Sequence, residues 1–237
     1  VTVAEVGEMI ALGQIELVGT VKAVDEAEIS AKISGNILRM QVDLGSVVKK
    51  GDLLVELSAG EIAAKLQQSR AQLEQAKRNL QREEKLLRND AGTPETVKAQ
   101  KDALRIAEAA FLESQTILNY TKIEAPFDGI ITHKFASTGD LATPGKPLLR
   151  IEAQDKLQIV TNIPEAMVHK IKRGDNISAY IPAIETLVDG IVTEISPAAD
   201  PSSRTTPIKI SIPAKPNMRS GQFVRVGFSS DESLTLA

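Results

Sequence analysis

The segment "DGIITHKFASTGDLATPGKPLLRI", residues 128–151, is a second copy of an earlier segment of the same chain. Moving back 94 positions without a gap gives "SGNILRMQVDLGSVVKKGDLLVEL", residues 34–57. Glycines coincide in the two copies, as Gly35 with Gly129, Gly45 with Gly139 and Gly51 with Gly145. Glycines at fixed spacing between short apolar runs indicate strands joined by tight turns. The repeat therefore predicts two halves of one small β-sandwich of the lipoyl-like (biotinyl-like) type.

The insert between the two copies has a helical period. Leucines recur every seven residues at Leu66, Leu73, Leu80 and Leu87, and a second stripe follows at Val97, Leu104, Phe111 and Leu118. Both stripes are typical of a heptad seam. Between them, "RNDAGTPE" (88–95) contains Gly92 and Pro94, which break a helix, and Thr93, which can cap the next one. This short connection predicts an antiparallel coiled-coil hairpin, whose first helix is roughly 40 Å long at about 1.5 Å per residue.

The sequence after residue 151 keeps a period near two. Apolar residues alternate in 156–164, 206–213 and 222–228, and the stretch 164–175 predicts a short helix that ends at Gly174. Several short strands with one small helix favour a compact β-barrel. The predicted fold class is thus mainly β, with a split sandwich, a long helical hairpin and a small barrel.

Composition excludes several functions. The net charge of −3 and the seven aromatic residues give no basic, stacking surface for nucleic acid. The chain has no cysteine, so disulfides, thiol nucleophiles and thiolate metal sites are absent. His133 and His169 are far apart in sequence and form no ligand set with cysteine. Because no catalytic motif is present either, we expect a protein that is not an enzyme and holds no metal.

A covalent cofactor is also not expected. Carrier domains with a lipoyl-like fold present a lysine at the tip of a tight turn. In their motif GD-x-L-x-x-I-E-T-D-K, this lysine follows the first glycine by ten residues. Counting from Gly51 gives Glu61, and counting from Gly145 gives Asp155, with Lys156 one position late. A one-residue slip turns a side chain to the other face of a hairpin. A lipoyl or biotinyl carrier subunit of an enzyme complex is therefore the weaker alternative, and attachment to Lys156 or Lys65 would support it.

Three stretches carry a resemblance to a known family. They are "YTKIEAPFDGII" (120–131), "GIVTEISPAADPSSRTTPIKI" (190–210) and "MRSGQFVRVGF" (218–228). In this order around a split sandwich, they resemble the membrane fusion proteins, the periplasmic adaptors of tripartite efflux pumps of the resistance-nodulation-division type in Gram-negative bacteria. The resemblance implies a bridge between an inner-membrane transporter and an outer-membrane channel that supports export of small molecules. An adaptor of an ABC-type exporter would share the fold and is the alternative.

The resemblance also implies the surroundings of the protein. Adaptors of this family work in the periplasm, attached to the inner membrane, and we expect the attachment to come from a segment outside this chain. Several copies pack side by side, as a trimer or hexamer in the assembled pump. We expect no nucleic acid partner and no cofactor.

The family carries an arginine, a leucine and a serine near the tip of its hairpin, which implies a docking site for the outer-membrane channel. This chain has Arg82, Leu86 and Thr93 at the same spacing, with threonine in place of serine. Leu86 lies one step, about 100°, from Leu87 in the heptad stripe, so we expect its side chain to be exposed. The alternative is structural: Arg82 as a solvated charge, Leu86 as a core residue and Thr93 as a helix cap alone.

The predicted domains follow from these patterns and the resemblance. The ranges are 25–57 with 122–153 for the sandwich, 58–121 for the hairpin, 14–24 with 154–231 for the barrel, 1–13 for the start of a membrane-proximal domain, and 232–237 for a tail.

Overall fold

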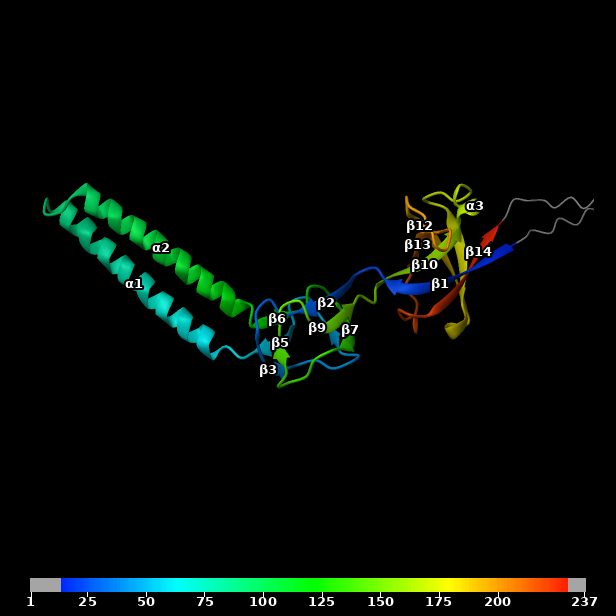
Figure 1. Ribbon diagram of the computed structural model, residues 1–237, viewed down its shortest axis with the longest axis horizontal. Coiled ribbons are helices and arrows are strands. Elements are labelled where there is room, and N and C mark those ends of the chain that lie inside the picture. Colours follow the sequence, from blue (N-terminus) through cyan, green and yellow to red (C-terminus); the bar gives the residue numbers. More distant parts are fainter. Residues whose placement is uncertain (1–13, 230–237) are drawn as a thin grey trace, which may run out of the picture. The chain divides into compact units, whose positions relative to one another are not determined.

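The computed structural model describes the backbone of residues 14–229 and the side chains of residues 16–228 (Figure 1). Two compact units are present: residues 27–151 form one, and the described residues up to 26 and from 152 onward form the other. The predictions for residues 1–13 and 232–237 lie outside the described residues.

The first unit contains a β-sandwich of two four-stranded sheets. One sheet has the order β2-β9-β7-β4 and the other has the order β6-β5-β3-β8. Their strands are β2 (Glu26–Ser30), β3 (Gly35–Met40), β4 (Val47–Val48), β5 (Leu53–Leu57), β6 (Lys122–Glu124), β7 (Gly129–Lys134), β8 (Leu141–Ala142) and β9 (Pro147–Glu152). Apolar side chains from both sheets, such as Leu54, Ile131 and Leu149, are buried between them.

The two sheets repeat each other along the chain. A shift of 94 residues carries β3 onto β7 and β4 onto β8, and the starts of β5 and β9 also coincide. Gly45 and Gly139 have φ values of 84° and 95°, a left-handed conformation that favours glycine at both equivalent turns. The prediction of two half-motifs in one sandwich is confirmed.

The two copies also exchange backbone hydrogen bonds. The N–H of Gly45 donates to the carbonyl oxygen of Ile131 at 2.8 Å, and the N–H of Gly139 donates to that of Ile37 at 2.9 Å. Each half thus closes the turn of the other half. Neither copy has its backbone groups satisfied alone, so the sandwich needs both.

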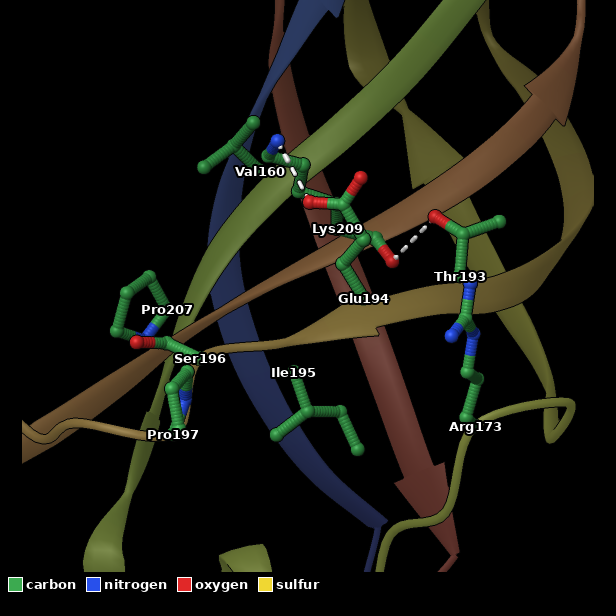
Figure 2. A pocket seen from close by; sticks show the side chains of 9 residues that line it. All are labelled: Val160, Arg173, Thr193, Glu194, Ile195, Ser196, Pro197, Pro207 and Lys209. Atoms are coloured by element: carbon green, nitrogen blue, oxygen red, sulfur yellow. Dashed lines mark hydrogen bonds and ion pairs between the residues drawn. The ribbon is translucent and has the colours of Figure 1, made fainter.

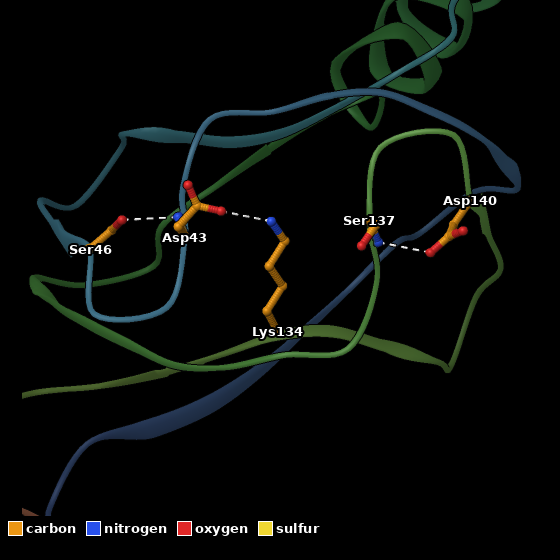
Figure 3. A network of polar contacts seen from close by, with 5 residues as sticks. All are labelled: Asp43, Ser46, Lys134, Ser137 and Asp140. Atoms are coloured by element: carbon orange, nitrogen blue, oxygen red, sulfur yellow. Dashed lines mark hydrogen bonds and ion pairs between the residues drawn. The ribbon is translucent and has the colours of Figure 1, made fainter.

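Each of these two turns also contains its own side-chain hydrogen bond, at positions related by the shift of 94 residues (Figure 3). The N–H of Asp43 donates to Ser46 Oγ at 2.9 Å, and the N–H of Ser137 donates to Asp140 Oδ2 at 2.8 Å. One contact breaks the symmetry: Lys134 Nζ donates to Asp43 Oδ1 at 2.8 Å and joins the two copies.

Two long helices, α1 (Gly60–Arg88) and α2 (Pro94–Asn119), fill the insert and run side by side in opposite directions (Figure 1). We call residues 60–119 the hairpin. Leu73 of α1 and Val97 of α2 are buried on the predicted stripes. Ser69 and Ser114 are buried too, and their hydroxyls donate to carbonyl oxygens of their own helices. The insert therefore has the predicted helical character, with small residues at part of the contact.

The second unit is a closed barrel. Among the described residues its strand order is β1-β10-β13-β12-β11-β14. The strands are β1 (Gln14–Ala23), β10 (Lys156–Pro164), β11 (Asn176–Ile181), β12 (Thr186–Ile195), β13 (Thr205–Pro213) and β14 (Phe223–Ser229), with a short 3₁₀ helix η1 (Pro182–Ile184) between β11 and β12. Val21, Ile159 and Ile210 are among the side chains that fill its interior.

The predicted helix over 164–175 is too long. The helix α3 spans only Glu165–Val168. After it, Lys170 and Ile171 donate to carbonyl oxygens three residues back, and the N–H of Lys172 donates to Asp175 Oδ2 at 2.7 Å. A carboxylate that satisfies a backbone donor in this way competes with continued helix. Gly174, with φ of 99°, ends a turn rather than a helix.

Candidate functional site

The tip of the hairpin is closed by a specific end to α1. Asp90 has φ of 55°, its N–H donates to Leu87 O at 3.2 Å, and the N–H of Ala91 donates to Leu86 O at 2.9 Å. These two bonds form a Schellman motif, in which glycine usually occupies the left-handed position. Aspartate is one of the few other residues that adopt this conformation. The connection between the helices is therefore an ordered turn.

The start of α2 is equally well defined. Thr93 is the N-cap, and its Oγ1 accepts a hydrogen bond from the N–H of Thr96 at 3.2 Å. Pro94 occupies the first helical position, where no N–H is needed. Gly92 packs against the end of α1, because a Cβ there would lie 2.9 Å from Leu87 N. The predicted break and cap are confirmed.

The three predicted docking residues lie at this end of the hairpin. Arg82 is exposed, and Leu86, one turn further along α1, exposes 37% of its surface. Leu87 is less exposed than Leu86, in agreement with its place on the stripe. Thr93 is exposed, but its hydroxyl already serves the cap, so its capping role is established. The exposed leucine and the arginine are the residues free to define a contact surface.

Charges around the tip follow the helix ends. Lys85 and Arg88 lie in the last turn of α1, where the helix dipole favours cations, and Glu95 lies in the first turn of α2, where it favours anions. Glu84 Oε1 and Lys101 Nζ lie 3.8 Å apart and link the two helices. The tip thus combines an apolar side chain with ordered charges of both signs.

The barrel carries a separate open hollow (Figure 2). It has a volume of about 520 Å³ and is lined by Val160, Arg173, Thr193, Glu194, Ile195, Ser196, Pro197, Pro207 and Lys209. Lys209 Nζ lies 2.7 Å from Glu194 Oε2, and its hydrogen bond and charge lower the pKa of Glu194. No local sequence pattern marks this hollow, because its residues come from separate strands and loops. Glu194 and Lys209 pair with each other, and the lining identifies no particular ligand.

The positions considered for cofactors do not lie on a hairpin tip of the sandwich. Glu61 and Lys65 are in the first turns of α1, and Lys156 begins β10 of the barrel, with its Nζ 3.5 Å from Asp25 Oδ2. His133 stacks on Phe135 with ring centroids 5.7 Å apart, while His169 follows α3. Within residues 16–228 no group of three or more histidine, aspartate or glutamate side chains could hold a metal ion. No helix in residues 14–229 is long and apolar enough to span a membrane.

Comparison with known proteins gives the class. Residues 25–152 match the model of the CzcB-like barrel-sandwich hybrid domain, and residues 157–232 match that of the CusB-like β-barrel domain. The first match covers more than half of the chain. The chain belongs to the membrane fusion proteins, the periplasmic adaptor family of efflux pumps.

Individual relatives agree with this family. The chain is 24% identical over 232 residues to the multidrug resistance protein MdtA of Proteus mirabilis, covering 88% of this chain and 56% of that protein. It is 25% identical over 206 residues to the nickel and cobalt resistance protein CnrB of Cupriavidus metallidurans. This match covers 82% of this chain and 52% of that protein. The chain thus spans a little over half the length of these relatives.

A solved structure shares the fold. It is a MacA–MexA chimeric protein that contains the α-hairpin domain of Pseudomonas aeruginosa MexA. The TM-score is 0.85 at 23% identity, covering 92% of this chain and 81% of the other. The match supports the presence of the sandwich, the helical hairpin and the barrel, and at this identity it supports the fold alone.

Proposed function

We propose that this chain is the periplasmic adaptor of a tripartite efflux pump driven by a transporter of the resistance-nodulation-division type. It bridges this inner-membrane transporter and an outer-membrane channel, and supports export of small molecules across a Gram-negative envelope. The observation that carries the proposal is the insertion of a long helical hairpin, with an ordered tip, into a duplicated sandwich. Such a hairpin offers reach and a contact surface.

The proposal assigns a role to each part. Arg82, Leu86 and Thr93 form the docking site for the channel, as the most distant part of an antiparallel coiled-coil arm over 58–121. The sandwich over 25–57 and 122–153 carries the arm, and the barrel over 14–24 and 154–231 is on the transporter side. The working form is a ring of three or six copies attached to the inner membrane. Closed rotational symmetry is the default for contacts made head to tail.

Deletion of the gene in its host tests this function. Cells that lack the adaptor should retain more fluorescent dye or divalent metal, and the full-length gene should restore export. Unchanged accumulation of every compound tested would contradict the proposal. Discharge of the proton gradient at constant ATP distinguishes the two classes of transporter. Export by a proton-driven transporter should stop at once, whereas continued export would identify an ABC-type transporter.

A further inference from the structure

The hollow of the barrel lies on the outer surface of three neighbouring strands. Val160 on β10 is opposite Lys209 on β13, and Lys209 is opposite Glu194 on β12. Residues directly opposite each other in a sheet point to the same side, and core residues such as Ile159 and Ile210 fill the other side. With a volume of about 520 Å³, the hollow has the size of a small-molecule site.

A β-bulge in β12 shapes the floor of this hollow. The register of β12 on β13 shifts between Val192 and Glu194, so Thr193 is an extra residue in the strand. Its hydroxyl donates to the carbonyl oxygen of Lys209 at 3.2 Å. Such a bulge bends the strand locally. Beyond it, Ile195 packs against the barrel core and also lines the hollow, so part of an apolar side chain is accessible there.

The loop before β11 places Arg173 at the same hollow. The N–H of Gly174 donates to Val192 O at 2.9 Å, and the N–H of Val192 donates to Asp175 O at 2.9 Å, which ties this loop to β12 just before the bulge. The Arg173 side chain is exposed, and within residues 16–228 its guanidinium makes no hydrogen bond or ion pair. The guanidinium donors are therefore available to a ligand.

The lining of the hollow carries one unbalanced positive charge. Glu194 Oε2 lies 2.7 Å from Lys209 Nζ, so these two groups neutralise each other. The hydrogen bond and charge of Lys209, and to a smaller extent the charge of Arg173, lower the pKa of Glu194. The outward neighbours of the ion pair on β10 and β13 are uncharged, namely Gln158, Asn162, Pro207 and Ser211. Arg173 is thus the cation that remains for a ligand.

The adjoining loops do not cancel this charge. Residues 169–175 and 196–204 contain two carboxylates and four cations, namely Asp175, Asp200, Lys170, Lys172, Arg173 and Arg204. Both carboxylates accept hydrogen bonds within their own loops, from the N–H of Lys172 at 2.7 Å and from the N–H of Ser202 at 2.8 Å. The surroundings of the hollow are therefore positive.

Cationic and apolar groups lie on different sides of the hollow. Figure 2 shows Arg173 on one side and Pro197 and Pro207 on the other, with Ile195 between them. An inorganic anion would leave the apolar side uncovered, and an uncharged apolar compound would leave the guanidinium without a partner. From this arrangement we propose that the hollow binds a small amphipathic anion, with its charged group at Arg173 and its apolar body across Ile195 toward the two prolines.

The lining defines this chemical class rather than a single compound. A site of this kind would give the protein direct contact with a small molecule, in addition to the proposed bridging role. The inference does not depend on that role, because binding is measured on the purified protein.

Decanoate is the probe, because it joins one carboxylate to an apolar chain. The purified 237-residue protein is titrated below the micelle concentration, and backbone amide shifts are followed by NMR. The amides of Thr193, Ile195 and Lys209 should shift together and saturate. Acetate, which lacks the chain, and decyltrimethylammonium, which has the opposite charge, should give no saturating shift there. Shifts that spread over the exposed apolar residues of sandwich, hairpin and barrel without saturation would show non-specific binding and overturn the proposal.

Substitution of the arginine tests its role. Arg173→Gln should weaken decanoate binding about tenfold, because a charge-assisted hydrogen bond is lost. Arg219→Gln is the matched control, since Arg219 is also exposed and lines another hollow of the barrel; it should leave the affinity unchanged. Thermal unfolding should be the same for both variants and the wild type. Equal weakening by the two variants, or no weakening by Arg173→Gln, would contradict the proposed site.

Charge reversal tests the apolar side independently. Arg173→Glu should lose decanoate binding and gain saturable binding of decyltrimethylammonium at the same three amides, because the apolar surface is kept while the charge changes sign. A variant that binds neither probe would show that the apolar side contributes nothing, which rules out an amphipathic ligand. Failure of the adaptor function appears separately, as equal accumulation in wild-type and deletion cells.

Discussion

Lys134 joins Asp43 by a hydrogen bond of 2.8 Å, and this ion pair links two turns that are otherwise related by the internal repeat. The position equivalent to Lys134 in the first half is Met40, so only one such link exists in the pair of halves. The carboxylate of Asp43 is largely exposed, with 87% of its side chain accessible. The repeated backbone bonds, rather than this ion pair, should therefore hold the sandwich together.

Neutralising this pair should have a small effect on stability. Asp43→Asn and Lys134→Met should each lower the free energy of unfolding by no more than about 1 kcal/mol, because exposed ion pairs are screened by water. A double-mutant cycle followed by urea unfolding measures the coupling, which should shrink in high salt. A coupling well above that limit would show that the asymmetric link is essential.

The two adjacent leucines at the hairpin tip should respond differently to a charge. Leu86→Asp should cost about 1 kcal/mol, because the side chain is partly exposed already, and should abolish export by removing the docking contact. Leu87→Asp should cost about 2 kcal/mol or more, because it places a charge on the α1–α2 contact. Thermal unfolding and an export assay are compared for both variants. Normal export by a stable Leu86→Asp protein would place the channel contact elsewhere.

Gly92 should be hard to replace. Gly92→Ala should destabilise the tip by about 1–3 kcal/mol, because the new Cβ would lie 2.9 Å from the backbone nitrogen of Leu87. Gly60→Ala is the control, since no atom lies within 4 Å of its Cβ position; that change should stabilise by about 0.4–1 kcal/mol. Hydrogen exchange of the tip amides measures local loss of structure, and circular dichroism measures unfolding of the whole chain. Equal behaviour of the two variants would mean that the tip turn adapts freely.

The barrel has a similar point of close packing. Gly190→Ala should cost about 1–3 kcal/mol or more, because a Cβ on β12 would lie 2.5 Å from Ile210 Cγ2 and 2.9 Å from Ser211 O. Gly227→Ala on β14 should be far milder, because its nearest contact is Ser178 O at 3.7 Å. Urea unfolding of both variants measures the difference. A Gly190→Ala protein as stable as the Gly227→Ala protein would contradict this account of the barrel core.

Acid should weaken one contact of the barrel hollow. Lys209 lowers the folded-state pKa of Glu194 below its ordinary value of 4.5. The stabilisation that this ion pair gives to the folded state is therefore complete above pH 4.5. It is lost as the pH falls through the lowered pKa of Glu194. Glu194→Gln should make the unfolding free energy less dependent on pH below 4.5, with little change at pH 7. An identical acid response in the variant would assign the pH dependence to other carboxylates.

The fold could be predicted where backbone geometry restricts the residue. Gly45 and Gly139 require a left-handed conformation, so the repeat remained visible in the sequence. Strands β11 and β12 carry a weaker sequence signal, because β11 contains small residues and Gly190 replaces an inward apolar side chain on β12. Asp90 in the left-handed turn was equally hidden, since glycine is the usual signal there.

The candidate site also contains features that the sequence predicts and features that it does not. The offset of Leu86 from the leucine stripe predicted its exposure, because helix geometry fixes the direction of neighbouring side chains. Thr93 could be predicted as a cap from Pro94, but whether its hydroxyl also reaches a partner depends on a second molecule. The hollow of the barrel depends on strands that meet only after folding, so no local pattern marks it.

The base of the hairpin gives the arm an adjustable length. The N–H of Leu57 donates to Thr121 O at 2.8 Å, so the chain is clamped where it leaves the sandwich and where it returns. A change in helix length beyond this bond leaves the residues that form it in place. Removing one heptad from each helix would shorten the arm by about 10 Å and keep both stripes in phase. Such paired deletions or insertions are a simple evolutionary route by which an adaptor could fit envelopes of different width.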